Sequence, residues 1–344
     1  MNNKLISIII VNWNGKKLLE RCLKSLASQR YIRTEIIVVD NGSTDGSKVY
    51  VKKNFPYIKL IENKTNLGFA QANNIGYDFA KGEYILFLNN DTQVTADFLK
   101  PLSKELESNQ KIGGVQSKIL LLEDKTKLDS IGAFFTNTGF LYHHGFRKQD
   151  QKKYQKQIEL FSAKGACTMF KKKVLEKVLV ENEVFDSRYF AYFEETDLCH
   201  RVWLSGFRIR YIPDSVIYHS VGATSSKMRE EFIQYHSFKN RIDSYLKNLS
   251  LEYLIKIIPL HFGLCIAAIF FYVLKGKPMV SLVIVKAIIW NFVNVPTTLK
   301  KRINIQKNIR RISDYKFLPK LTKQISLSYF IAHLRGLESY KEIS

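Results

Sequence analysis

The sequence predicts an α/β domain, built on a mostly parallel β-sheet with helices on both faces, followed by a basic and apolar helical region. Three observations predict this. Segments with strand and helix patterns alternate through the first 120 residues, as they do in parallel sheets. The strand segments are continuous runs of Ile and Val, which indicates burial on both faces. After Gly222 the composition shifts to long apolar runs between lysines and arginines.

Length and composition exclude several classes of protein. A chain of 344 residues exceeds one ordinary domain of about 150 residues. Apolar residues make up 46% and aromatic residues 13%, which excludes a disordered chain. The four cysteines include no CxxC pair, so a disulfide scaffold and a zinc ribbon are excluded and a reducing compartment is favoured. The first apolar run, of about seven residues, is too short for a signal peptide, and we expect the first domain not to be exported.

The elements of the α/β domain are predicted from local patterns. A helix over 16–29, for example, places Leu19, Leu23 and Leu26 on one face. Strands are expected at 5–11, 35–39, 58–61, 84–88, 209–212 and 216–218. Helices are expected at 16–29, 45–54, 69–81, 171–180 and 196–205. Residues 116–165 are less regular and predict strands and an ordered loop over the site.

The helical region contains two apolar runs behind a basic, amphipathic segment at 232–249. Residues 254–274 carry only Lys256 and His261 as strongly polar side chains, and a helix of this length covers about 30 Å, roughly one hydrocarbon core. Residues 279–295 form the second run. Three interpretations remain open: a hairpin that crosses or dips into a bilayer, amphipathic helices in the interface, and buried helices of a soluble domain.

The charge balance predicts a polyanionic partner. Lys and Arg outnumber Asp and Glu by 53 to 31, a net charge of +22, which fits nucleic acid, anionic lipid or a phosphorylated substrate. Lys239, Arg241 and Lys247 precede the apolar runs, and nine basic residues lie between Lys300 and Lys323. Basic residues beside apolar helices favour an anionic membrane surface over nucleic acid, with both flanks on the cytoplasmic side.

Polar residues stand at the carboxyl ends of the predicted strands, where parallel sheets bind ligands. They are Asn12, Asp40-Asn41, Glu62-Asn63 and Asn89-Asn90-Asp91. The alternative is that these residue types simply make good turns. A carboxylate such as Asp40 can accept the imide N–H of a pyrimidine, and Gly68 at a helix start suits a phosphate or a ribose, unless it serves close packing.

Two further groups carry candidate chemistry. Asp91, with His219, offers a carboxylate and an imidazole to a divalent cation, and the imidazole favours Mn²⁺ over Mg²⁺. The alternative for the histidine is a polar turn residue at the end of a strand. Glu194, Glu195 and Asp197 crowd one aromatic-rich segment, where like charges and burial raise carboxyl pKa values toward those of a general base. The alternative for the acids is a favourable place in the first turn of a helix.

Six ordered motifs together resemble the family 2 glycosyltransferases of GT-A fold, and most closely their rhamnosyltransferase-like branch. The resemblance covers residues 4–245 and implies a Rossmann-like, mixed sheet. The motifs are Val11-Asn-Trp-Asn-Gly15, Val38-Val-Asp-Asn-Gly-Ser-Thr-Asp-Gly-Ser47, Asn66-Leu-Gly-Phe-Ala-Gln-Ala-Asn-Asn74, Phe87-Leu-Asn-Asn-Asp-Thr92, Tyr192-Phe-Glu-Glu-Thr-Asp-Leu-Cys-His-Arg201 and Tyr218-His-Ser-Val-Gly-Ala-Thr-Ser225.

The resemblance implies a role for each matched residue. Asp40 would read the base of a nucleotide-sugar. The remaining donor-binding residues would be Asn12, Asn41, Gly68, Asn73, Asn89 and Asn90. Asp91 matches the last acid of the family's DxD motif and would hold Mn²⁺ or Mg²⁺ on the diphosphate, with His219 as a further ligand; Asn89 replaces the first acid of that motif.

For catalysis, the resemblance implies a single inverting displacement. Glu195 matches the second acid of the family's Glu-Asp pair and would be the catalytic base, with Glu194 and Asp197 as alternatives. No Gln-x-x-Arg-Trp segment of the processive synthases is present, so we expect the addition of one sugar. The donor would be a dTDP- or UDP-sugar, with rhamnose favoured.

The implied organisation is a transferase domain at 1–245 and a membrane-association region at 246–344. The acceptor would be a lipid-linked or polysaccharide glycan in cell-surface polysaccharide biosynthesis. The expected location is the cytoplasmic face of the plasma membrane, whether peripheral, monotopic or hairpin-anchored. The alternatives are a non-catalytic nucleotide-sugar- or glycan-binding protein of the same fold and a nucleotidyltransferase, for which 12–17 is a poor glycine-rich loop.

Overall fold

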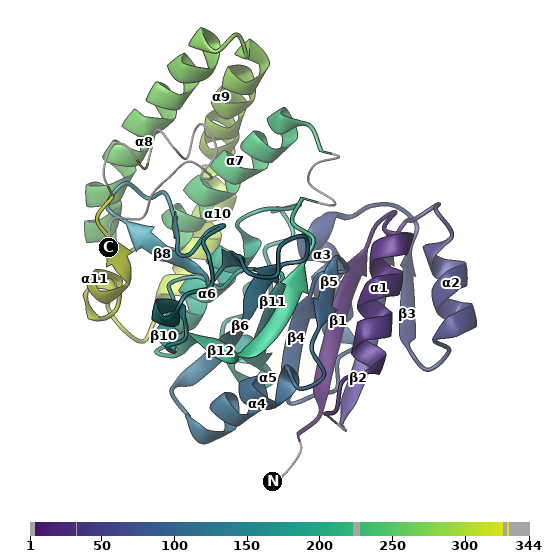
Figure 1. Cartoon of the computed structure of the whole chain (residues 1–344). Coiled ribbons are helices and arrows are strands. Elements are labelled where there is room, and N and C mark those ends of the chain that lie inside the picture. Colours follow the sequence, from purple (N-terminus) through teal and green to yellow (C-terminus); the bar gives the residue numbers. More distant parts are fainter. Residues whose placement is uncertain (1–3, 32, 223–227, 326–328, 330–344) are drawn as a thin grey trace.

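A ten-stranded mixed sheet forms the body of the protein (Figure 1). The computed structural model describes residues 4–31, 33–222, 228–325 and 329. The strands follow the order β10-β12-β6-β11-β4-β1-β2-β3, with β5 on β12 and β7 on β6. Their bounds are β1 Ile6–Asn12, β2 Thr34–Asn41, β3 Lys59–Asn63, β4 Tyr84–Leu88, β5 Thr92–Val94, β6 Ile112–Leu121, β7 Leu128–Ser130, β10 Ile158–Glu159, β11 Cys167–Lys171 and β12 Arg208–His219.

Helices cover both faces of this sheet, as predicted. Successive side chains of a strand point to opposite faces. In β1, Ile8 and Ile10 accordingly join the core beneath α1, α2 and α4, whereas Ile9 joins the core beneath α3, α5 and α6. All three isoleucines are fully buried. The bounds are α1 Lys16–Ala27, α2 Ser47–Asn54, α3 Gly68–Asp78, α4 Leu99–Ser108, α5 Lys172–Lys177 and α6 Glu194–Leu204.

The strands β4, β1, β2 and β3 run parallel, and β11 lies antiparallel between β4 and β6. The alternation of strands and helices predicted the parallel part. The two strands expected at 209–212 and 216–218 are one strand, β12, with a register shift after Ile212. Residues 133–143 form β8 Ala133–Thr136 and β9 Tyr142–His143, and the short helix η1 Lys152–Tyr154 follows.

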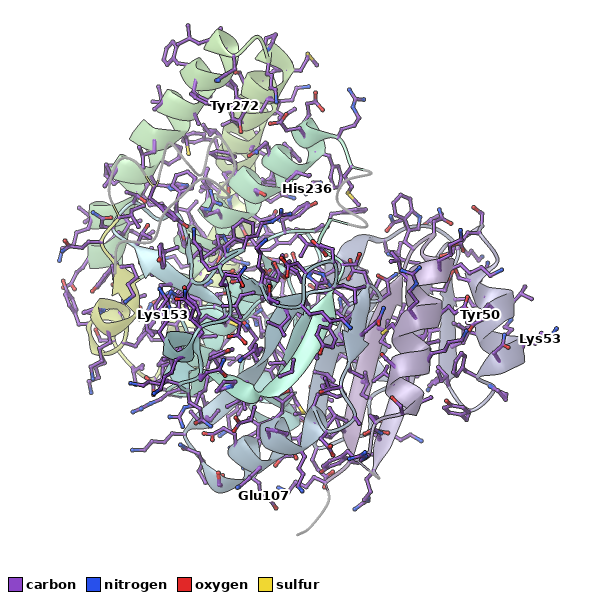
Figure 2. The ribbon with its side chains drawn as sticks, in the orientation of Figure 1. Tyr50, Lys53, Glu107, Lys153, His236 and Tyr272 are labelled. Atoms are coloured by element: carbon purple, nitrogen blue, oxygen red, sulfur yellow. The ribbon has the colours of Figure 1, made fainter. Side chains whose placement is uncertain are left out.

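The helical region begins with α7 Glu230–Asn248. Helices α8 Leu251–Leu274 and α9 Pro278–Val293 then make a hairpin that projects from the sheet (Figure 1). In Figure 2, Tyr272 on α8 lies near the top of the molecule and Tyr50 on α2 lies toward its right edge. By length and composition α8 is able to cross a membrane, and α9 passes the same test together with 295–309, from which a 63° bend separates it. After the hairpin, the described residues form α10 Val295–Asn304, η3 Ile305–Ile309, η4 Asp314–Lys316, α11 Leu318–Leu321 and β13 Thr322–Lys323.

Residues 305–323 join the main body. The predicted boundary at residue 245 falls inside α7. Beyond it, Ile305, Ile309 and Leu318 belong to the same core as the sheet residues, and β13 pairs with β8. The region after 245 therefore divides into a projecting hairpin and a part that packs onto the α/β domain.

A buried ion cluster fixes this junction. Asp186, in the loop before α6, lies 2.7 Å from Lys247 Nζ and 2.9 Å from Lys301 Nζ. Lys247 is also 3.3 Å from carboxylate oxygens of Asp197 and Asp243. Each of these side chains is nearly inaccessible to solvent.

The basic residues ahead of the apolar runs do not face a membrane. Lys239, Arg241 and Lys247 are 4%, 7% and 1% exposed, so the prediction that they form a basic membrane flank is wrong. An amphipathic pattern shows that one face of α7 is polar, but it does not show that the fold buries that face.

Candidate active site

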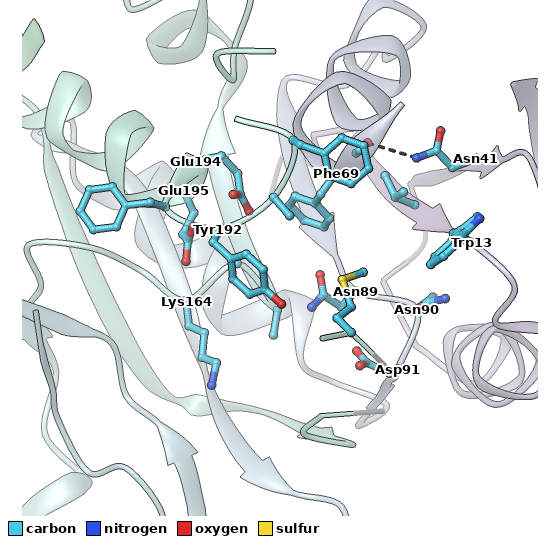
Figure 3. A pocket seen from close by; sticks show the side chains of 18 of the residues that line it. Trp13, Asn41, Phe69, Asn89, Asn90, Asp91, Lys164, Tyr192, Glu194 and Glu195 are labelled. Atoms are coloured by element: carbon cyan, nitrogen blue, oxygen red, sulfur yellow. Dashed lines mark hydrogen bonds between the residues drawn. The ribbon is translucent and has the colours of Figure 1, made fainter. Parts of the chain in front are cut away.

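A cavity of about 420 Å³ opens at the carboxyl ends of β1, β2 and β4 (Figure 3). The end of β12 and the turn that leads into α6 complete its walls. Eight residues predicted for the site line it: Asn41, Gly68, Asn89, Asn90, Asp91, Glu194, Glu195 and His219. The part of the motif at 223–225 lies outside the described residues.

Asn12 and Asp40 stand behind the cavity wall, where both are almost fully buried. Asn12 Nδ2 donates to Asp40 Oδ2 at 3.1 Å, and the backbone N–H of Ser43 donates to Asp40 Oδ1 at 2.8 Å. Asn90 Nδ2 donates to Asn12 Oδ1 at 2.8 Å. This chain of bonds fixes Asn90, which does line the cavity.

Asn41 ties the second strand end to the start of α3. Its Nδ2 donates to Asn66 Oδ1 at 2.8 Å and to the carbonyl oxygen of Gly68 at 3.1 Å, and Figure 3 marks a hydrogen bond of Asn41 with a dashed line. Gly68 has φ +86°, and a Cβ atom there would lie 2.5 Å from the carbonyl oxygen of Phe190. That oxygen accepts the N–H of Phe69 at 2.6 Å, so a backbone carbonyl occupies the helix start. Asn73 donates to Phe69 O at 2.9 Å and does not line the cavity.

A relay of charged side chains runs behind Asp91. His219 Nε2 lies 3.1 Å from Asp91 Oδ1, and His219 Nδ1 lies 2.8 Å from Asp129 Oδ2. Lys164 Nζ lies 2.5 Å from the other oxygen of Asp129. Burial works to lower the pKa of His219, but its hydrogen bonds to Asp129 and Asp91 outweigh burial and raise the pKa to about 9.

The polar atoms next to Asp91 fit a divalent cation. Within the described residues, Asn89 Oδ1 is buried without a hydrogen-bond partner, and the buried Asp91 Oδ1 has His219 Nε2 as its neighbour at 3.1 Å. Hard oxygen donors are the ligands that Mg²⁺ and Mn²⁺ prefer. No group of three or more His, Cys, Asp or Glu side chains suited to a metal occurs in the part of the chain described. A cation here would therefore need the oxygens of a bound ligand as well.

Glu194 and Glu195 begin α6 after a strained turn. Tyr192 and Phe193 both adopt left-handed conformations, with φ of 69° and 71°, which are costly for bulky residues. The turn directs both glutamates into the cavity, and in this view Tyr192 separates them from Asn89 (Figure 3).

Both glutamates have raised pKa values. Burial raises the pKa of Glu194 most, and the charge of Glu195 adds to it. Burial also raises the pKa of Glu195, although backbone N–H groups at the helix start and Lys164 oppose the rise. One oxygen of each carboxyl group has no hydrogen-bond partner among the described residues. Each is therefore free to accept a proton from a ligand.

Asp197 does not reach the cavity. It lies 3.1 Å from Arg201 Nε and accepts a hydrogen bond from Asn248 Nδ2 at 2.8 Å. Burial works to raise its pKa, but the charges of Lys247 and Arg201 prevail and lower the pKa. It is a fixed anion of the ion cluster that joins α6 to α7.

The sequence reading missed several residues of the site. Lys164, Trp13 and Tyr192 line the cavity, and Asp129 orients His219 from behind. Tyr192 lies inside a recognised motif, directly before the acids. For Asp129 there was no signal, since it lies 90 positions from its partner in the segment with an irregular pattern.

The model of glycosyl transferase family 2 matches residues 7–179. The chain belongs to this family. It is 25% identical to glycosyltransferase GlyG of Streptococcus pneumoniae over 241 residues, 67% of this chain and 75% of GlyG. It is 30% identical to an uncharacterized glycosyltransferase of Haemophilus influenzae over 127 residues, which span 36% of this chain and 39% of that relative. A putative colanic acid biosynthesis glycosyl transferase of Escherichia coli is 38% identical over 101 residues, 28% of this chain and 36% of that protein.

Solved structures show the same fold. The mannosyltransferase PcManGT of Pyrobaculum calidifontis, solved with GDP-Man and Mn²⁺, has a TM-score of 0.52 and 17% identity, covering 98% of this chain and 88% of that one. GalNAc-T7 with UDP, GalNAc and Mn²⁺ has a TM-score of 0.55 and 17% identity, covering 73% and 49%. These likenesses confirm the predicted GT-A fold.

Proposed function

We propose that this member of family 2 is an inverting glycosyltransferase that moves one sugar from a nucleoside-diphosphate donor to an acceptor hydroxyl in polysaccharide biosynthesis. One observation carries the proposal. A single cavity holds the unpartnered oxygen of Asn89 and the carboxylate of Asp91, which His219 contacts, together with Glu195, a carboxyl group of raised pKa. The oxygens suit a cation on a diphosphate, and the glutamate suits a general base.

The donor would lie along the strand ends. Asn41, Gly68 and Asn90 face the cavity, and Asn12, Asp40 and Asn73 support this wall from behind. Asn89 and Asp91 would hold Mn²⁺ or Mg²⁺, joined by His219 after it loses its proton. A bound cation would offset the charge that develops on the leaving diphosphate. We favour dTDP-rhamnose as the donor, ahead of a UDP-sugar.

Glu195 would carry the proton transfer, with Glu194 beside it. The unpartnered oxygen of Glu195 accepts the proton of the acceptor hydroxyl, and the oxygen of the acceptor then forms the new bond to the anomeric carbon. The bond from this carbon to the diphosphate oxygen breaks on the opposite face, which inverts the configuration. The electron pair leaves with the nucleoside diphosphate.

We further propose that the hairpin α8–α9 holds the enzyme on the cytoplasmic face of the plasma membrane, near a lipid-linked acceptor. Its outer surface exposes large apolar side chains, Phe270 at 64%, Leu274 at 87% and Phe292 at 66%. Such exposed apolar surfaces mark contact with lipid or protein. Six basic residues of 300–323 are exposed nearby in sequence and would attract anionic lipid: Lys300, Lys307, Arg311, Lys316, Lys320 and Lys323.

Calorimetric titration with dTDP, UDP and GDP, each with and without Mn²⁺, tests the donor site. We expect binding of one pyrimidine nucleotide that requires Mn²⁺ and is lost in Asp91→Ala. Asp97→Ala is the matched control, since Asp97 is an exposed aspartate that pairs with Arg30. Absence of binding by all three nucleotides in both conditions would refute the proposal.

A further inference from the structure

A second cavity, of about 370 Å³, adjoins the first. The two share Tyr192, Phe193 and Glu195. The other walls of the second cavity come from residues 140–146 and from helices α7 and α8. A hydroxyl group bound in this cavity would therefore meet the same carboxyl group that faces the first one.

Several aromatic side chains and one buried cation line the second cavity. Arg241 of α7 lines it and is 7% exposed. The guanidinium carbon lies 4.4 Å from the ring centre of Phe140, 5.4 Å from that of Phe193 and 5.7 Å from that of Phe238. These rings hold the guanidinium in place and attract its charge, but they do not accept hydrogen bonds from the N–H groups in the guanidinium plane.

Arg241 lacks the polar partners that a buried cation needs. Within the described residues, its Nε and Nη1 atoms have no hydrogen-bond partner, and no carboxylate makes an ion pair with it. Burial accordingly lowers the pKa of Arg241. The two other buried cations of α7 are satisfied, since Lys239 donates to the carbonyl of Arg188 at 2.6 Å and Lys247 contacts Asp186 at 2.7 Å. An unpaired buried charge is strongly unfavourable unless a ligand supplies the anion.

We propose that the second cavity is the acceptor site and that Arg241 binds a phosphate group of a lipid-linked acceptor. This rests on the proposed function for the nature of the reaction. The fork of N–H donors on arginine matches a phosphate. The lipid end is indicated by Tyr272, which lines the cavity from α8, the helix whose outer surface is apolar (Figure 2).

The size of the cavity limits where the new sugar is added. Arg241 and Glu195 line the same volume of about 370 Å³, which has room for a phosphate and one or two sugars but not for a long glycan between them. The accepting hydroxyl thus belongs to a sugar close to the phosphate. The reaction that supplies this acceptor must be one that places a first sugar on a lipid phosphate.

The test is binding of farnesyl diphosphate, inorganic pyrophosphate and farnesol to the full chain in detergent micelles. EDTA is present so that no cation near Asp91 retains a diphosphate. We expect Arg241→Gln to weaken binding of farnesyl diphosphate about 10- to 100-fold and to leave that of farnesol unchanged. Arg241→Lys should keep part of the affinity. Arg229→Gln is the matched control, because Arg229 is exposed and precedes the same helix.

Equal affinity of wild type and both Arg241 variants for farnesyl diphosphate would overturn the proposal. If pyrophosphate bound as tightly as farnesyl diphosphate, with the same dependence on Arg241, the proposal that the acceptor carries a lipid would be overturned. Titration of the same Arg241→Gln protein with dTDP and UDP plus Mn²⁺ separates the two proposals. Nucleotide binding by Arg241→Gln shows that this variant is folded. Absence of nucleotide binding by the wild type would refute the donor site and leave the acceptor site to be judged by the farnesyl diphosphate result.

Discussion

The carboxyl edge of the sheet and the hairpin α8–α9 are built in opposite ways. At the edge, polar side chains such as Asn12 and Asn90 are buried and fixed by hydrogen bonds. On the hairpin, apolar side chains such as Phe270 and Phe292 are exposed. Fixed polar groups suit chemistry on a bound ligand, and exposed apolar groups suit contact with an apolar phase. Changes in one region should therefore leave the property of the other intact.

The largest expected effect comes from the acid at the edge. Glu195→Gln keeps the shape of the side chain but removes its ability to accept a proton. We expect kcat to fall about 10²- to 10⁴-fold, with donor binding by calorimetry and vesicle binding both unchanged. Unchanged kcat in this variant would favour a non-catalytic role for the residue.

Glu194→Gln is the matched comparison. Glu194 lines the first cavity but not the second. We expect a smaller loss of kcat than for Glu195→Gln. A larger loss would exchange the roles of the two glutamates.

Most of the α/β domain was predictable because its signals are local. The buried runs of β1, β2 and β4, and the stripe of α1, lie within single segments. Helix α4 and the start of β6 were missed. In β6, Gly113 and Gly114 weaken the strand pattern, and Gln116 and Lys118 are buried polar residues. The place of β11 between β4 and β6 depends on packing, which no local pattern reports.

The candidate site divides in the same way. The strand-end residues and Glu195 were predictable because their motifs are contiguous. The series of contacts from Lys164 through Asp129 to His219 was not predictable, because it joins segments that are distant in the sequence. Arg241 was interpreted as a membrane flank, because composition distinguishes a charged residue from an apolar one but not a buried charge from an exposed one.

The second largest effect is expected at the joint between the two regions. Asp186→Asn removes the carboxylate that contacts Lys247 and Lys301 and leaves two buried cations undercompensated. Loss of one partner from a buried pair costs about 3–5 kcal/mol, so the free energy of unfolding should fall by that order in denaturant titrations. Asp97→Asn, at an exposed pair, should change it little. An unchanged free energy of unfolding in Asp186→Asn would contradict the role of the ion cluster at this junction.

A moderate effect is expected on the hairpin. Phe270→Ser and Phe292→Ser remove apolar area worth about 1.5–3 kcal/mol each if it is buried in lipid. Binding to vesicles of phosphatidylethanolamine and phosphatidylglycerol, measured by flotation, should weaken about 10- to 100-fold for each substitution, with kcat on a soluble acceptor unchanged. Tyr57→Ser is the control, since Tyr57 is 69% exposed and lies in the loop between α2 and β3, away from the hairpin. Equal loss in the control would mean that the hairpin is not the membrane contact.

The smallest effect concerns the pH dependence of kcat/KM. Because burial raises the pKa of Glu195, the base is protonated and inactive at a pH where an exposed glutamate, with a pKa of about 4.3, would still work. Activity should therefore be lost as the pH falls through this raised pKa, and should recover above it. Lys164 opposes the rise, so Lys164→Met should raise the pKa of Glu195 further and move the acidic limb to higher pH. Lys127→Met, at an exposed lysine that lines neither cavity, should leave the limb in place. The contrary result would be an acidic limb at unchanged pH together with a lower maximal kcat/KM in Lys164→Met. It would mean that Lys164 acts through Asp129 and His219 on donor binding, because this does not change the proton affinity of Glu195.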